Sequence, residues 1–105
     1  MRVELDVFSG RPNPRWELDE DSAVALRCLL SRLSVSTDTP PKEPGLGYRG
    51  FVFAGETGRQ RAYKGYVIRS DTVFADPSSS IERFLSDRLP TELRDLRSRI
   101  ALEGE

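Results

Sequence analysis

The spacing of apolar residues changes several times along this chain, and those changes limit the folds open to it. Near the N-terminus Val3, Leu5 and Val7 alternate with charged residues, the period-two pattern of a half-buried strand. Over residues 20–33 the leucines recur at helical spacing, so we expect a helix there. Strand-like and then helical patterns follow. The order β-α-β-β-β-α-α predicts an α+β fold, a single domain over residues 1–105, with a four-stranded, mostly antiparallel sheet and the helices packed on one face.

Turn-forming residues divide the chain at places that agree with this order. Residues 34–47 are rich in Pro, Gly, Ser and Thr, and we expect a long loop there. Aromatic and β-branched residues are concentrated in the segment after this loop, which is typical of strands. The three expected strands cover residues 48–54, 61–69 and 72–75.

Two further helices are expected near the C-terminus. Ser79 and Glu82 have the spacing of a capping box, which predicts the start of the second helix. A break at Pro90 separates it from a third helix, in which Leu93 and Leu96 lie on the apolar side.

The side chains available for chemistry are few. The chain has no histidine and one cysteine, Cys28, among its 105 residues. Ser-His-Asp catalysis, Cys-His catalysis and a His/Cys metal cage therefore have no basis in this sequence, and we expect neither a metal nor a cofactor. With no apolar run of membrane-spanning length and a single cysteine, we expect a cytoplasmic protein without a membrane partner.

The loop from Arg11 to Arg15 is the first candidate binding feature. Two arginines flank a Pro-Asn-Pro sequence that stiffens the loop, and a rigid pair of guanidinium groups suits a carboxylate or phosphate. The alternative is a rigid turn whose arginines pair with nearby carboxylates. The candidate ligand-binding residues are Arg11, Asn13, Arg15, Trp16, Tyr48 and Arg49.

Apolar residues on both faces of the expected strands form the second feature. Phe51 and Phe53 alternate with Val52, so neither face of that strand is polar. We therefore expect the second face to be covered, either by the protein's own loops or by another chain. The candidate interface residues are Val52, Tyr63 and Tyr66.

Charge patterns leave two more possibilities. Residues 44–69 hold five basic residues against one acidic residue, interleaved with aromatic rings, which is compatible with binding single-stranded nucleic acid. A net charge of −1 for the whole chain argues against a dedicated polyanion binder. Glu4 and Asp6 lie on one face of the first strand, where they could share acid–base work or pair with cross-strand arginines.

These features favour a non-catalytic binding or accessory module that engages a protein partner, or a second copy of itself, through a sheet edge or the partly apolar sheet face. The first alternative is a binder of an anionic small molecule, or a cofactor-free enzyme acting on one, that uses the arginine loop. Nucleic-acid binding is the second alternative. A steep dependence of affinity on salt would indicate a polyphosphate ligand, and a shallow one an apolar partner face.

Overall fold

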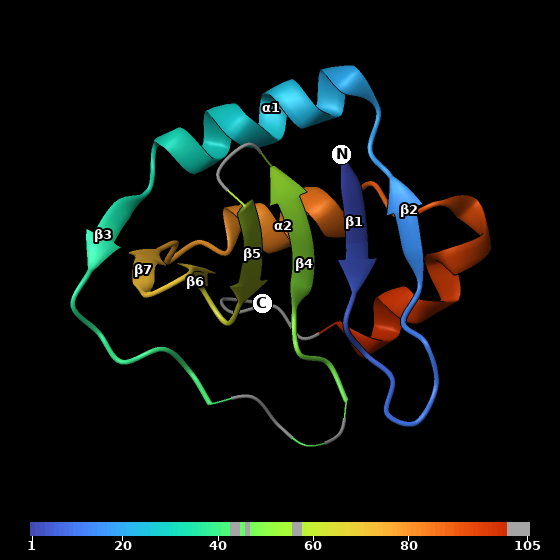
Figure 1. The fold of residues 1–105 in the computed structure, drawn as a ribbon. Helices are drawn as coiled ribbons and strands as arrows, with labels where there is room; N and C mark the ends of the chain where they lie inside the picture. The colour runs from blue at the N-terminus through green and yellow to red at the C-terminus, as the bar shows by residue number, and fades with distance from the viewer. Residues whose placement is uncertain (43–44, 46, 56–57, 101–105) are drawn as a thin grey trace.

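A computed structural model describes residues 1–42, 45, 47–55 and 58–100. Its centre is a seven-stranded sheet in which every neighbouring pair is antiparallel, in the order β2-β1-β4-β5-β6-β7-β3 (Figure 1). The strands are β1 Arg2–Leu5, β2 Arg15–Glu17, β3 Ser34–Ser36, β4 Phe51–Gly55, β5 Gly58–Tyr63, β6 Tyr66–Arg69 and β7 Thr72–Ala75. The helices are α1 Glu20–Ser31, α2 Ser80–Ser86 and the 3₁₀ helix η1 Thr91–Arg99.

The α+β class and the antiparallel sheet agree with the prediction, but the prediction of four strands was wrong. Two short edge strands, β2 and β3, were missing from it, and β3 occupies the first three residues of the expected loop 34–47. The expected strand 61–69 is instead a hairpin, β5 and β6, which turns at Lys64 and Gly65 with positive φ values of 50° and 81°. Positive φ at both central residues is typical of the tight turns that join antiparallel strands.

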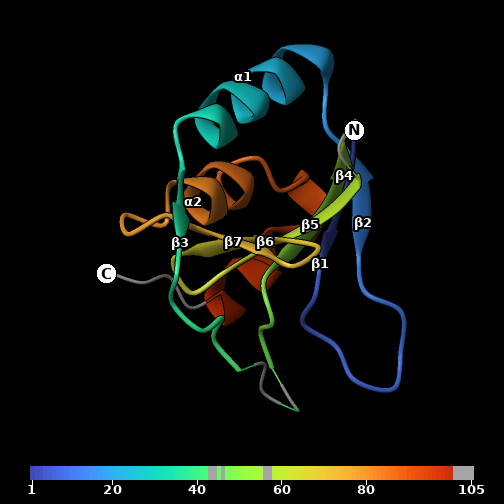
Figure 2. The ribbon, with the colours of Figure 1, turned by 60° about the vertical axis from the view of Figure 1, so that its left-hand side comes forward.

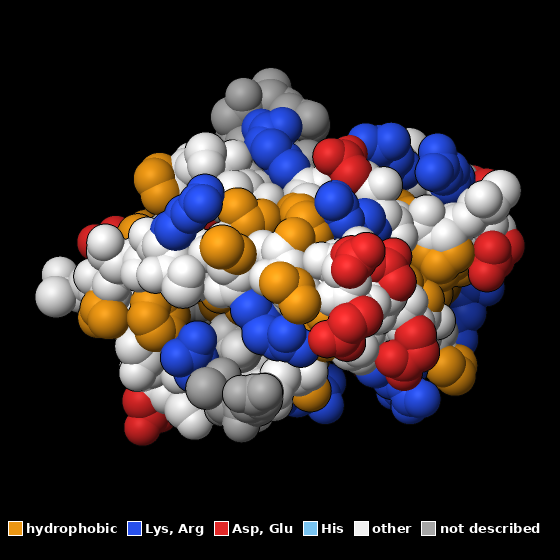
Figure 3. All heavy atoms as spheres, turned by 90° about the horizontal axis from the view of Figure 1, so that it is seen from above, with side chains coloured by type: hydrophobic (Ala, Val, Ile, Leu, Met, Phe, Trp, Pro, Cys, Tyr) orange, Lys and Arg blue, Asp and Glu red, His pale blue; other side chains and the backbone are white. Residues whose placement is uncertain are grey.

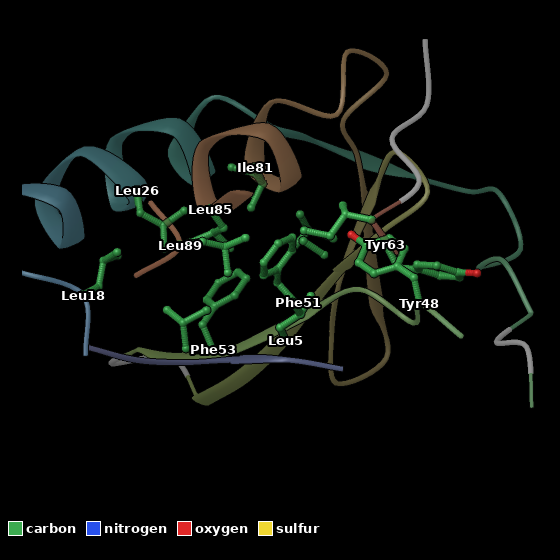
Figure 4. Packing of buried hydrophobic residues seen from close by; sticks show 14 of the residues in the cluster. Leu5, Leu18, Leu26, Tyr48, Phe51, Phe53, Tyr63, Ile81, Leu85 and Leu89 are labelled. Carbon is green, nitrogen blue, oxygen red and sulfur yellow. The ribbon is translucent and has the colours of Figure 1, made fainter. Parts of the chain in front are cut away.

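The helices lie on one side of the sheet. Figure 1 views the opposite face, with α2 behind the central strands and α1 across their upper ends. Figure 2 shows α1 and α2 as successive layers above the strands β5 to β7. Phe51 and Phe53 point from β4 toward these helices and meet Leu26 of α1 and Leu85 of α2 (Figure 4).

The start of α2 differs from the predicted capping box. Ser79 has a left-handed backbone conformation and makes no capping hydrogen bond with its side chain. Asp76 caps the helix instead, since its carboxylate accepts hydrogen bonds from the Ile81 N–H at 2.9 Å and the Ser80 hydroxyl at 2.7 Å. Glu82 faces the core and is 1% exposed. In the part of the chain that the structure describes, no helix is long and apolar enough to cross a membrane.

Candidate interaction surface

The register of the seven strands places one row of side chains across the whole helix-free face. Neighbours in this row are paired directly across adjacent strands, so their side chains lie side by side. From edge to edge the row is Arg15, Glu4, Val52, Arg61, Ile68, Val73 and Ser36. The row is charged at the β2 edge and apolar toward β7.

Charges of opposite sign face each other at the β2 edge. Arg15 donates from Nε to a Glu4 carboxylate oxygen at 3.0 Å. Two residues along the same strands, and on the same face, Arg2 donates from Nε to a Glu17 carboxylate oxygen at 3.4 Å. Arg2, Glu4 and Arg15, with Val52 and the exposed Ala54 and Arg59, line an open hollow of about 250 Å³ on the helix-free face.

Asp6 anchors a second group of charges beside this row. Its Oδ1 accepts from Nε and Nη2 of Arg49 at 3.0 and 2.8 Å, and its Oδ2 accepts from Nη1 of Arg61 at 2.7 Å. Burial alone would raise the pKa of Asp6, but the two guanidinium groups outweigh it and hold the pKa below its usual range. Arg49 therefore forms an ion pair within the chain. For Asp6 this is the pairing with a cross-strand arginine that the sequence offered as the alternative to acid–base work.

The loop from Arg11 to Arg15 is organised by Asn13. The Asn13 carbonyl oxygen accepts from the backbone N–H groups of Val7 and Phe8 at 3.0 and 2.8 Å. Its amide group donates to Glu4 and Asp6 at 3.1 and 3.0 Å. The Arg11 guanidinium stacks 3.8 Å from the centre of the Phe8 ring.

The structure does not bring the six candidate ligand-binding residues into one site. Arg15 lies on the helix-free face, and Asn13 and Arg49 reach the carboxylates there. Trp16 instead packs edge-on against Phe51 on the helix side, and Arg11 stacks on Phe8, which packs against the core. Tyr48 is also on the helix side, where its hydroxyl donates to Glu82 at 2.5 Å.

Glu82 shares this buried site with the β5–β6 turn. Its second carboxylate oxygen accepts from the Gly65 N–H at 3.0 Å. Burial raises the pKa of Glu82, because the hydrogen bonds from Tyr48 and from the turn compensate only part of the lost hydration. The same contact and burial raise the pKa of the Tyr48 hydroxyl. This cluster ties α2 to the turn.

The three candidate interface residues are mostly covered by this chain. Tyr63 is 3% exposed and packs on Tyr48, with ring centres 5.7 Å apart. Tyr66 is half-buried, and its hydroxyl donates to Asp38 at 2.7 Å, which fixes the start of the loop after β3. Val52 is 6% exposed although it faces away from the helices. Arg61 is its cross-strand partner and reaches Asp6, the residue after β1, so the Arg61 stem must cross β4 beside Val52 and shield it.

The β2 edge was missed because its signal in the sequence is weak. Three residues after a proline-rich turn give too short a pattern for a strand, and only one of them is apolar. The available signal was the sequence Arg-Trp-Glu itself, in which opposite charges flank an aromatic residue at period-two spacing.

Comparison with protein-family models, with curated proteins and with solved structures gives no match for this chain. Among the described residues, no group of three or more histidine, cysteine, aspartate or glutamate side chains could hold a metal ion. The geometry of the surface is therefore the basis for a functional proposal.

Proposed function

We propose that this chain is a non-catalytic binding module that associates with a second copy of itself through the β2 edge. The observation that carries the proposal is the order of charges on the helix-free face of β1 and β2. If two β2 strands pair antiparallel with Trp16 facing the partner's Trp16, each Arg15 lies opposite the partner's Glu17. The charges then alternate without interruption from Glu4 through Arg15 of one copy to Glu17 and Arg2 of the other.

The backbone of β2 supports this pairing. The Leu5 N–H donates to the Pro14 carbonyl at 3.0 Å and the Leu18 N–H to the Met1 carbonyl at 2.7 Å. Alternation along a strand then directs the backbone groups of Arg15 and Glu17 away from β1. These are the residues that would exchange hydrogen bonds in the proposed pairing. In Figures 1 and 2, β2 is the outermost strand at this edge of the sheet.

The other edge of the sheet supports a weaker case. The residues of β3, Ser34–Ser36, carry no charge, and the 68% exposed Val35 is its one apolar residue. A neutral edge offers no charge pattern that would select a partner or a register.

Two charge reversals test the proposal. The Glu17→Arg chain has two basic residues on the β2 edge, and the Arg15→Glu chain has two acidic ones. In each variant alone, residues 15 and 17 of the two copies carry like charges and face each other. We therefore expect its dimerisation affinity to be about tenfold to a hundredfold weaker than that of the wild type. An equimolar mixture restores both opposite-charge pairs and should form a heterodimer. Sedimentation equilibrium measures all three cases.

Asp71→Arg is the matched control, because Asp71 is an exposed residue in the β6–β7 turn, away from β2. It should leave wild-type association unchanged. A wild-type chain that stays monomeric at about millimolar concentration would refute the proposal. So would a dimer that is indifferent to both reversals, which would direct attention to β3.

A further inference from the structure

Two polar residues occupy the helix-facing side of the sheet, where apolar residues are expected. Gln60 of β5 pairs with Arg69 of β6, and the register puts both on the same face as Phe53 and Val67. Gln60 is 3% exposed. Polar groups in such positions are costly to bury unless hydrogen bonds satisfy them.

The Arg69 guanidinium is only partly satisfied. Its Nη2 donates to Oε1 of Gln60 at 3.3 Å, and the group lies 4.9 Å from the centre of the Phe74 ring. Its Nε is buried and finds no hydrogen-bond acceptor among the described residues. The guanidinium group therefore keeps hydrogen-bonding capacity that no described residue uses.

A cavity of about 200 Å³ adjoins this group, between α1 and the sheet. Arg27, Leu30 and Ser31 line it from one side of α1, as their spacing along the helix requires. Figure 3 looks down on α1 and shows acidic side chains gathered at its N-terminal end, on the right. The cavity lies under the part of the helix that follows this acidic end, where Arg27 is the basic residue of α1. Its full lining is Met1, Arg27, Leu30, Ser31, Gly55, Gln60 and Arg69.

We propose that this cavity binds the oxyanion group, carboxylate or phosphate, of a small organic molecule. Arg69 would receive the anion through its guanidinium group, and Arg27 would contribute a second guanidinium at the exposed side. Met1 and Leu30 would contact an apolar portion. The ligand is smaller than a drug-sized molecule, since cavities for those are about 300–1,000 Å³. This site is separate from the β2 edge and does not depend on self-association.

Nuclear magnetic resonance of the ¹⁵N-labelled chain tests the proposal directly. Arginine Nε–H signals are followed while sodium butyrate, or separately inorganic phosphate, is added to about 10 mM, since so small a probe is expected to bind weakly. We expect the Arg69 Nε–H signal and the Gln60 side-chain amide signals to shift in a saturable way with one of the probes. A response to butyrate alone identifies a carboxylate site, and a response to phosphate alone a phosphate site. No shift with either probe beyond that of the exposed Arg94 would overturn the proposal.

Variants confirm where the probe binds. Arg27→Ala changes an exposed helix residue, so the chain should fold, and we expect about tenfold weaker probe binding. Arg69→Lys should weaken binding further, because lysine lacks the planar donor group. Arg94→Ala is the matched control and should bind as the wild type does. Unchanged binding in Arg27→Ala would contradict the assigned cavity even if Arg69→Lys did not fold. Arg15→Glu, which changes a residue outside the cavity lining, should bind the probe normally, which separates this test from that of self-association.

Discussion

Asp6 and Glu82 show how the same chemical group takes opposite roles according to its neighbours. Asp6 is 8% exposed and lies between two guanidinium groups, so its charged form is favoured and its pKa is lowered. Glu82 is 1% exposed and receives hydrogen bonds from neutral donors, Tyr48 and the turn at Gly65. Burial dominates there and raises its pKa. Asp6 therefore stabilises the fold as an anion, whereas Glu82 is more easily protonated in the folded chain.

Replacing Asp6 with asparagine should destabilise the protein by about 2–3 kcal/mol at neutral pH, because two partly buried arginines lose their counter-charge. The folded-state pKa of Asp6 lies below its unfolded value of about 3.8. Its stabilising contribution is therefore present above that value and is lost as the pH falls through the folded-state pKa. Urea unfolding of the wild type and Asp6→Asn from pH 7 to pH 2.5 should show the difference shrinking at the acid end. A difference independent of pH would contradict the ion-pair explanation.

Gly50 is the glycine whose replacement should cost most. It has a φ of 100°, and a Cβ there would lie 2.3 Å from the Ala62 carbonyl oxygen and 2.9 Å from the Tyr63 Cβ. Since the first obstacle is backbone in the neighbouring strand, Gly50→Ala should lower the free energy of unfolding by about 3 kcal/mol or more. Gly47→Ala is the control, since Gly47 also has a positive φ, 85°, but nothing within 4 Å of the added atom. It should cost about 1 kcal/mol. Equal costs in chemical denaturation would exclude the steric contribution.

At the scale of the elements, the sequence predicted the parts whose burial pattern is strong. The alternation in β1, the leucines of α1 and the aromatic residues of β4 are consequences of one buried face, and each element was expected near its observed place. The edge strands have no such pattern, because one side of an edge strand has no neighbouring strand and three residues give little periodicity.

The candidate site was harder to predict than the fold, for a related reason. That Arg49 pairs with Asp6, 43 residues away, depends on the pairing of β1 with β4, which local patterns do not reveal. The inward-facing Arg69 was equally hidden, because the turn at Lys64 and Gly65 that sets its register was read as the interior of one long strand.

The start of α2 gives a prediction about one element. Asp76→Ala removes the acceptor for the Ile81 N–H and should lower the free energy of unfolding by about 1–2 kcal/mol. Ser79→Ala removes a buried hydroxyl that has no partner among the described residues, so stability should change by less than about 0.5 kcal/mol. Thermal unfolding followed by circular dichroism measures both. The reverse order would restore Ser79 as the cap.

For the molecule as a whole, the sheet order predicts a graded pattern of hydrogen exchange. β4 and β5 have a strand on each side and lie under the core, so their amides should exchange last. The amides of Arg15 and Glu17 point away from β1 and should exchange fast in dilute solution. If two copies pair through β2, these two amides become protected as the protein concentration rises. Exchange at these two positions that is independent of concentration, in a sample shown to be dimeric, would place the interface elsewhere.

The two edges of the sheet belong to one continuous stretch of chain. From β2 the chain enters α1, crosses the upper ends of the strands and descends directly into β3 (Figure 1). The 12 residues of α1 extend for about 18 Å, which is a large part of the roughly 29 Å across six strand spacings. The length of this helix and the number of strands beneath it must therefore match. Adding or removing a helical turn would shift one of the two edge strands out of register. The sheet therefore constrains the length of α1, although α1 is not one of its strands.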